Sequence, residues 1–381
     1  MQAQINQFGN TLQDLIALAL GERSYTRAQL TRKLGVSRPV LSRALDPMIH
    51  DGFVLSEVSA REGGAGRPVQ YLSLVDGAAY IVGLSIGRNE AAGVLINRAG
   101  QQLFATSFEY LAYRGWEKPL RKLLSLLMRG IAENSIDTKT IAGTGVALPM
   151  SAFRDSDAAK AAAMVREEWS GGCVYDNIVA MAALAHLHSP AGSLAASPQM
   201  YVRLSGGVGS CFMWSSPVEN IPQVVAGEFG HVSIPGIAQK CHCGNIGCLE
   251  LAASYAALCN GAEVESLADF RQKLDSGDPQ TADVLNRGAA ALGFACAQVA
   301  MAAHPSHIYL GGEVVAELPQ IVSLTQAQMR RNFSPAIQWE VPISSIPMDG
   351  AACAWGAVCA VKTSVAALQI KNESIATVMR L

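Results

Sequence analysis

One imidazole and three thiols lie within eighteen residues of this sequence, and they constrain its fold more than any other stretch. His231 ends the segment Gly-Glu-Phe-Gly-His, and the run Cys-His-Cys-Gly-Asn-Ile-Gly-Cys begins at residue 241. Three thiolates and one imidazole fill the tetrahedral coordination of a structural Zn²⁺ and leave no position open. Gly244 and Gly247 suit a loop folded around an ion, because glycine tolerates positive φ. The predicted ligands are His231, Cys241, Cys243 and Cys248.

Two alternatives compete with this site. The cysteines could be reduced cytosolic thiols that cluster without a metal, and His242 could replace His231 as the nitrogen ligand. Since His242 lies between two cysteines that are expected to bind, His231 is the better candidate. Two carboxylates, Glu228 and Glu250, flank the cluster.

The composition is that of a globular protein. The 381 residues suffice for two or three domains, and with half of them hydrophobic and 16% charged they can bury a large core. Nine cysteines, three of them in the cluster, favour metal binding in a reducing compartment over a disulfide framework. The N-terminus lacks the pattern of a signal peptide, and no eighteen apolar residues follow one another without interruption. We expect a cytoplasmic protein without membrane insertion.

The N-terminal segment differs from the rest in charge and in pattern. Residues 1–75 hold eight basic and six acidic side chains, a net charge of +2, whereas the remainder carries −4. This balance favours contact with a polyanion at the N-terminus. Apolar spacing predicts a helix over residues 11–20. A second helix is predicted at 27–34, with Thr26 as N-cap and Gly35 as its end.

A third helix completes a helix-turn-helix pattern. Ser37 is expected to cap it, with Pro39 in its first turn, and Pro47 is expected to kink it or end it early. Side chains facing outward near its start can reach bases or phosphates in a major groove. These predicted DNA contacts are Arg38, Ser42 and Arg43.

A β-hairpin wing is predicted next. Two strand-like runs, Phe-Val-Leu-Ser-Glu-Val after Gly52 and Val-Gln-Tyr-Leu-Ser-Leu after Pro68, flank a glycine-rich loop. Arg67 in this loop can enter a minor groove, whose negative potential favours a guanidinium. Residues 1–75 are therefore predicted to form a winged helix-turn-helix DNA-binding domain. The alternative is a helical bundle for dimerisation with a flexible linker at 61–67.

Beyond residue 78 the sequence alternates between strand and helix patterns. Glycine-rich turns follow two of the predicted strands, at Ser-Gly-Gly-Val-Gly from residue 205 and at Gly311-Gly312. This alternation is typical of an α/β architecture. The predicted strands are 80–85, 92–96, 104–109, 141–148, 200–204 and 308–310, and the predicted helices are 118–134 and 178–188.

With these motifs the chain resembles the ROK family (repressors, open reading frames and kinases), in its transcriptional-regulator branch, over nearly its whole length. The most specific match is Gly-Glu-Phe-Gly-His followed by Cys-x-Cys-Gly-x-x-Gly-Cys-Leu-Glu. The resemblance implies a two-lobed, actin-like or sugar-kinase-like α/β domain after the winged helix-turn-helix, with a sugar cleft between the lobes. It implies lobe 1 at 78–190, lobe 2 with the zinc site at 191–365, and a C-terminal helix at 366–381 that packs back on lobe 1.

Departures from the family's kinases predict that this chain is not an enzyme. Those kinases hold ATP phosphates with an Asp-x-Gly-x-Thr-like turn, whereas Ser-Ile-Gly-Arg-Asn at 85–89 lacks the acidic residue and the threonine. Their catalytic base is the aspartate of an Asn-Asp-x-Asn-like stretch. Asp176 matches it, but Tyr175 and Ile178 stand in place of the asparagines. Asp176 is thus a vestigial base, or else the cap of a helix that begins at Asn177.

The resemblance also implies an effector site. In the family, the positions of Glu228, His231 and Glu250 bind sugar hydroxyls, with the histidine using its second nitrogen, and Asp176 is the fourth candidate. The alternative role of the first three is support of the zinc site. The implied function is a regulator, most often a repressor, of carbohydrate-related genes. It would bind double-stranded operator DNA as a homodimer or homotetramer and respond to a sugar or sugar phosphate. The alternatives are an ATP-dependent sugar kinase with an added N-terminal domain and a regulator controlled by a protein partner.

Overall fold

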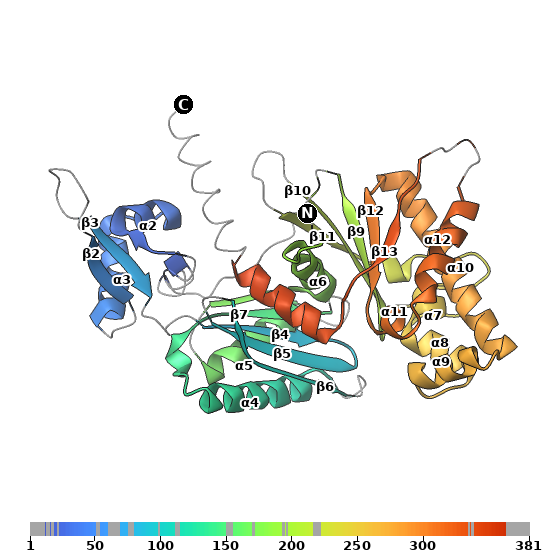
Figure 1. The fold of residues 1–381 in the computed structure, drawn as a ribbon, viewed down its shortest axis with the longest axis horizontal. Coiled ribbons are helices and arrows are strands. Elements are labelled where there is room, and N and C mark those ends of the chain that lie inside the picture. Colours follow the sequence, from blue (N-terminus) through green and yellow to red (C-terminus); the bar gives the residue numbers. More distant parts are fainter. Residues whose placement is uncertain are drawn as a thin grey trace. The chain divides into compact units, whose positions relative to one another are not determined.

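The computed structural model forms two compact units (Figure 1). Unit 1 contains Gly87–Asn89 and Asn177–Cys353, and unit 2 contains the described residues of 12–86, 90–176 and 354–362. The predicted C-terminal helix at 366–381 and Arg67 lie outside the described residues. The structure describes residues 12, 16, 19, 20, 23–50, 54–59, 69–74, 80–97, 100–110, 115–149, 155–169, 172–192, 195, 197–215, 222–333, 336 and 339–362.

Two helices of unit 2 lie where the sequence predicted them, and α2 has the predicted caps. Helix α2 (Arg27–Leu34) begins with a capping box, in which Thr26 and Gln29 each accept the other's backbone N–H. It ends at Gly35, whose φ of 63° is left-handed. Helix α3 (Arg38–His50) continues through Pro47, so the expected early end at Pro47 does not occur.

A small antiparallel sheet packs beside these helices. Its strand order is β1 (Tyr25–Thr26), β3 (Val69–Leu74), β2 (Val54–Ser59), and β2 and β3 are the two runs predicted to flank the glycine-rich loop. The helices and the sheet bury a shared core because each contributes an apolar face. That core contains Leu30, Leu41, Leu45, Met48, Val54 and Leu72.

The large sheet of unit 2 has five strands, and β4 is its central strand. The strands β4, β5 and β6 form an antiparallel meander, and β7 lies parallel to β4. Helices α4 (Glu117–Glu133) and α5 (Asp155–Glu168) cover one face. The strand order is β6 (Gln102–Glu109), β5 (Glu90–Ile96), β4 (Tyr80–Ile86), β7 (Ile141–Leu148), β8 (Gly172–Asn177).

A helix from the end of the described chain closes the other face of this sheet. Ala354 and Val358 of the helix Gly350–Lys362 pack against side chains of β5. A Cβ at Gly83 would collide with the carbonyl oxygen of Ala354, and one at Gly145 would collide with that of Ala357. The two glycines thus permit the close approach of helix and sheet.

Unit 1 contains a second five-stranded sheet. The strands β9, β10 and β11 are antiparallel, and β12 lies parallel to both β9 and β13. The predicted strands at 200–204 and 308–310 are therefore present, in β9 and β12. The strand order is β11 (Pro222–Gly227), β10 (Val208–Ser215), β9 (Gln199–Leu204), β12 (His307–Gly311), β13 (Ile343–Ser345).

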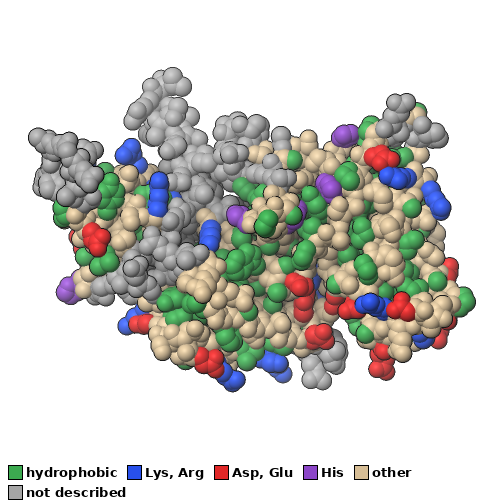
Figure 2. All heavy atoms as spheres, viewed as in Figure 1, with side chains coloured by type: hydrophobic (Ala, Val, Ile, Leu, Met, Phe, Trp, Pro, Cys, Tyr) green, Lys and Arg blue, Asp and Glu red, His purple; other side chains and the backbone are tan. Residues whose placement is uncertain are grey.

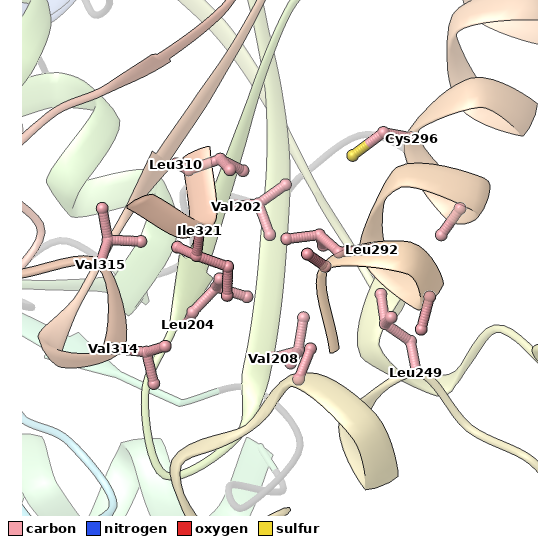
Figure 3. Packing of buried hydrophobic residues seen from close by; sticks show 14 of the residues in the cluster. Val202, Leu204, Val208, Leu249, Leu292, Cys296, Leu310, Val314, Val315 and Ile321 are labelled. Carbon is pink, nitrogen blue, oxygen red and sulfur yellow. The ribbon is translucent and has the colours of Figure 1, made fainter. Parts of the chain in front are cut away.

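Helices cover one face of this sheet and form the largest core. Val202 and Leu310 of the sheet and Leu292 of α10 meet in this core (Figure 3). Among the described helices, α10 alone has a length and hydropathy that would suit a membrane span, but its buried side chains belong to this core. The helices of this layer are α7 (Glu250–Ala253), α8 (Tyr255–Ala262), α9 (Leu267–Asp275), α10 (Pro279–Ala303), α11 (Glu313–Glu317) and α12 (Gln320–Arg331).

Tyrosine and histidine rings pack on the opposite face of the unit 1 sheet. Side chains alternate along a strand, so Tyr201 and Tyr309 face away from the main core. His186 of α6 (Ile178–Leu187) lies with its ring centroid 4.5 Å from that of Tyr309, and His307 stacks on Tyr309 at 4.2 Å. Burial lowers the pKa of both histidines, and the charge of His307 lowers that of His186 further.

The boundaries of the two units differ from the domain boundaries predicted from the sequence. Helix α6 lies in unit 1 and residues 354–362 lie in unit 2, whereas the boundary predicted between the lobes was 190–191 and residues 354–365 were expected in lobe 2.

On the face drawn in Figure 2, acidic and basic side chains are interspersed. On that face, attraction to a polyanion must therefore come from local groups.

Candidate metal centre and ligand site

The four predicted zinc ligands converge in unit 1. Their ligand atoms all lie within 4.8 Å of one another. The Sγ atoms of Cys243 and Cys248 are 3.6 Å apart, and Sγ of Cys241 is 3.7 Å from Nδ1 of His231. Ligands placed tetrahedrally at about 2.3 Å from an ion are separated by about 3.8 Å. The donor set and its spacing therefore fit a structural Zn²⁺.

The loop that carries the cysteines is held by its own backbone. Gly244 and Gly247 have φ of 96° and 78°, as expected for a loop folded around an ion. The N–H of Cys241 donates to the carbonyl of Asn245 at 2.7 Å, and the N–H of Ile234 donates to that of Gly247 at 2.7 Å. These bonds hold the backbone of the loop that carries the thiols.

The thiols differ in acidity. Burial raises the pKa of Cys248 to about 12. A hydrogen bond from the backbone N–H of Asn245 is the main cause that lowers the pKa of the exposed Cys243. Because a metal binds the thiolate, metal binding must release protons here, and affinity must fall as pH falls.

The two histidines near the thiols differ in how their nitrogens are placed. Nδ1 of His231 faces the thiols, and its Nε2 lies 3.8 Å from Oε2 of Glu228. His242, the alternative nitrogen ligand, has Nδ1 3.6 Å from Sγ of Cys241 and 3.2 Å from Oε1 of Glu250. His231 is thus placed to join the cluster to Glu228, whereas the family resemblance implies that its second nitrogen faces a sugar ligand.

Glu250 is buried and paired. Its Oε1 lies 3.3 Å from Nη1 of Arg88, and its Oε2 accepts the backbone N–H of Val208 at 3.1 Å. A Cβ at Gly207 would lie 2.5 Å from Glu250 Oε2 and 3.0 Å from the guanidinium of Arg88, so a larger residue would have to displace the ends of these two side chains. The Arg88 guanidinium also donates to the carbonyl of Gly206 at 3.3 Å. Arg88 therefore covers the glycine loop that follows β9.

Asn89 is hydrogen-bonded to a second carboxylate, that of Glu313. Its Nδ2 donates to both oxygens of Glu313, at 2.8 and 3.0 Å, and Ser205 Oγ donates to the same carboxylate at 3.0 Å. The Oδ1 of Asn89 is buried and has no hydrogen-bond partner among the described residues. Such an acceptor suits a hydroxyl from a ligand or a water.

A cavity of about 1020 Å³ opens beside Glu250 in unit 1. Arg88, His242 and Glu250 line it together with Phe294 of α10. Glu228 and His231 do not line it, so the predicted effector residues of unit 1 divide between the cavity and the edge of the metal centre.

Asp176 belongs to unit 2 and lies in β8. Helix α6 begins at Ile178, and its N-cap is Asn177, whose Oδ1 accepts the N–H of Val179 at 2.7 Å. The alternative that Asp176 caps this helix is therefore wrong. Asparagine and aspartate cap helices equally well, so residue type could not decide between adjacent positions.

The predicted DNA contacts differ in exposure. Arg38 and Arg43 are exposed on α3, and Ser42 is half-buried and accepts a hydrogen bond from Arg27. Neither the role of Arg27 nor the pairing of Arg88 with Glu250 was predicted from the sequence. Arg27 is fifteen residues from Ser42, and Arg88 is 162 residues from Glu250, so no local pattern could have paired them.

Comparisons with known proteins agree with the two-unit fold. The sequence is 27% identical over 267 residues to a putative xylose repressor of Caldicellulosiruptor sp. (strain Rt8B.4), covering 67% of this chain and 66% of that one, just under two thirds. The crystal structure of a ROK family transcriptional regulator, a homolog of the E. coli MLC protein, matches 95% of this chain and 98% of its own, with 18% identity and a TM-score of 0.59. A ROK hexokinase from Thermus thermophilus matches 74% of this chain and 97% of its own, with 20% identity and a TM-score of 0.56.

The two structural likenesses show the actin-like, sugar-kinase-like fold with its mixed sheets. The sequence model of the ROK family matches residues 81–363, which is most of the chain and includes the Cys/His cluster. The chain therefore belongs to the ROK family.

Proposed function

We propose that this protein is a DNA-binding transcriptional repressor of carbohydrate-related genes, controlled by a sugar or sugar-phosphate effector. One observation carries the proposal. Helices α2 and α3, joined by three residues, precede the part matched to the ROK family, and α3 exposes Arg38 and Arg43. The β2–β3 pair beside them supports a winged helix-turn-helix over residues 1–75. The relative named as a putative xylose repressor supports the same class.

DNA binding is tested with a duplex selected by the protein from a random-sequence pool. Arg43→Ala should weaken binding of that duplex about tenfold or more, because an arginine contact to a base or phosphate is lost. Arg330→Ala is the matched control, since Arg330 lies on α12 and pairs with Glu340 at 2.7 Å. Unchanged binding by an Arg38→Ala/Arg43→Ala double variant would refute the assignment of α3.

The effector is proposed to bind near the metal centre. Glu228, 65% exposed, and the Nε2 edge of His231 offer polar partners for adjacent hydroxyls, and Asn89 Oδ1 offers a buried acceptor. Asp176 and Glu250 remain candidate ligands. A ligand that binds the folded state raises its thermal midpoint, so xylose is the first sugar to test, followed by other sugars and sugar phosphates. Glu228→Gln should reduce the shift while metal content stays the same.

Zn²⁺ is proposed as a structural ion held by His231, Cys241, Cys243 and Cys248. When bound it cross-links the loop and fixes the imidazole of His231, whose second nitrogen then faces Glu228. The chain is proposed to act in the cytoplasm, where these thiols stay reduced. Helix-turn-helix proteins commonly read paired half-sites, so a homodimer or homotetramer is proposed and can be measured by light scattering.

A second candidate is an ATP-dependent sugar kinase, because a hexokinase shares the fold and Asp176 is retained. The turn at 85–89 argues against it, because its arginine is engaged with Glu250 and its asparagine with Glu313. We therefore propose that the protein is not an enzyme. Phosphate transfer from ATP to xylose or glucose, abolished by Asp176→Asn, would replace this proposal. Control by a protein partner is the alternative if no sugar shifts the thermal midpoint.

A further inference from the structure

Arg27 of α2 holds two side chains of α3. Its Nη1 donates to Oγ of Ser42 at 3.2 Å, and its Nη2 lies 2.9 Å from Oδ1 of Asp46. Ser42 and Asp46 are four residues apart and thus lie one above the other on α3. A single planar guanidinium can span both because its donors form a fixed fork.

Asp46 lies on the face of α3 that carries Arg43. Residues three apart on a helix are surface neighbours, and both side chains are exposed. Asp46 is the one acidic residue in the sequence of α3. A duplex that contacts Arg43 would bring its phosphates near this carboxylate, and like charges repel. The guanidinium of Arg27 offsets that charge.

The pair contributes little to folding, because its two side chains are 36% and 60% exposed and exposed ion pairs are weak. Its consequence therefore lies in the charge and geometry that α3 presents. Ser42, with its hydroxyl directed to Arg27, is engaged within the domain. Arg38 and Arg43 then remain as the side chains of α3 that meet a nucleic acid.

We propose that Arg27 is a positioning residue that masks Asp46 and thereby makes the outer face of α3 cationic. This inference rests on the proposed DNA-binding function. Arg27 acts through Asp46 and Ser42 and makes no phosphate contact of its own. Loss of Arg27 exposes the Asp46 carboxylate to the duplex, and removal of that carboxylate cancels the effect.

The test uses the full chain and one duplex, selected by the wild type from a random-sequence pool. Wild type, Arg27→Ala, Asp46→Asn and the double variant are titrated at several salt concentrations. Arg27→Ala should weaken binding about tenfold. Asp46→Asn should bind at least as tightly as the wild type, and it should restore most of the loss in the double variant. The loss caused by Arg27→Ala should shrink as the salt concentration rises, because salt screens the repulsion between the Asp46 carboxylate and the phosphates.

Two further variants serve as controls. Arg32→Ala removes an exposed arginine from the last turn of the same helix and should bind like the wild type. Arg27→Lys keeps the charge beside Asp46 and should retain most of the affinity, so the test remains decisive if Arg27→Ala fails to fold. Circular dichroism establishes which variants are folded.

Other outcomes overturn the proposal. If Arg27 contacted a phosphate directly, Asp46→Asn would restore nothing in the double variant. A purely structural brace would give equal losses in Arg27→Ala and Asp46→Asn, because each breaks the same pair. If the folded wild type selects no duplex, the proposed function fails and this inference fails with it. If the wild type binds but the double variant stays as weak as Arg27→Ala, the inference alone fails.

Discussion

The guanidinium of Arg88 lies 3.3 Å from the carboxylate of Glu250, and the two residues are 162 positions apart in the sequence. Arg88 comes from the turn that corresponds to the phosphate-binding turn of the family's kinases, and Glu250 is a predicted effector ligand. The turn on which the proposed absence of kinase activity rests and the proposed effector site are thus joined by one ion pair. A sugar that needs Glu250 must bind beside this pair or displace Arg88 from it.

Breaking this pair should destabilise unit 1. Arg88→Ala leaves a buried carboxylate with fewer partners and should lower the free energy of unfolding by about 2 kcal/mol. The loss in Arg88→Ala/Glu250→Gln should be smaller than the sum of the single losses, because no charge is left unpaired. Urea unfolding of the four proteins gives the coupling energy. Additive losses would show that the pair contributes nothing.

Removal of one thiol should abolish metal binding. Cys243→Ser replaces a soft thiolate ligand with a hydroxyl, so the purified protein should lose its zinc. Elemental analysis measures this directly. Cys296→Ala, a change at a buried cysteine of α10 outside the cluster, should keep one equivalent. A Cys243→Ser protein that retains one equivalent would refute the site.

The rate at which the thiols react with a disulfide reagent should also identify Cys243. Cys243 is the exposed cysteine of the nine, and its pKa is lowered chiefly by the N–H of Asn245. After chelation, a disulfide reagent such as Ellman's should modify Cys243 first, since the thiolate is the nucleophile. Added Zn²⁺ should protect it, and the fast phase should be absent from Cys243→Ser. A fast phase that persists in that variant would point to another thiol.

Stability should fall as the solution is acidified, through His186 and His307. Burial lowers the pKa of both in the folded protein, so below about pH 6.5 the unfolded chain binds protons that the folded chain does not. The free energy of unfolding therefore decreases from pH 7.5 to pH 5.5. Release of metal in acid would add to this decrease.

The contribution of His186 can be separated from that of the metal. His186→Gln retains a polar group near the hydroxyl of Tyr201, which lies 3.2 Å from Nδ1 of His186. The wild type and the His186→Gln variant have the same metal centre, so metal release affects both equally. The difference between their free energies of unfolding should therefore narrow at pH 5.5 relative to pH 7.5. An identical difference at both values would exclude a role for this imidazole.

Local features of the sequence predicted local structure well. The six strands and two helices that were predicted after residue 78, the N-cap Thr26 and the convergence of three cysteines all depend on residues within about twenty positions of one another. The site networks depend on distant residues. That Glu250 would meet Arg88, and Asn89 would meet Glu313, is decided by tertiary packing, which periodicity does not encode.

The choice of N-cap for α6 was also beyond the sequence, because Asp176 and Asn177 are both good capping residues. The backbone direction at the end of β8 decides it, and that direction depends on the sheet. Likewise, Pro47 was expected to kink α3 or end it early, and the helix continues to His50. Burial of Leu45 and Met48 in the small core offsets the cost of the proline.

The close approach of the helix Gly350–Lys362 to Gly83 and Gly145 has a consequence for biosynthesis. The sheet that holds these glycines is complete in the nascent chain when β8 has emerged, but Ala354 and Ala357, which cover it, are translated more than two hundred residues after Gly145. At ribosomal speeds this delay lasts about ten to forty seconds. During that time one apolar face of the sheet stays uncovered while all of residues 177–353 is made. A chaperone that shields this face, or a slow codon stretch that shifts the delay, would alter the yield of folded protein without altering its sequence.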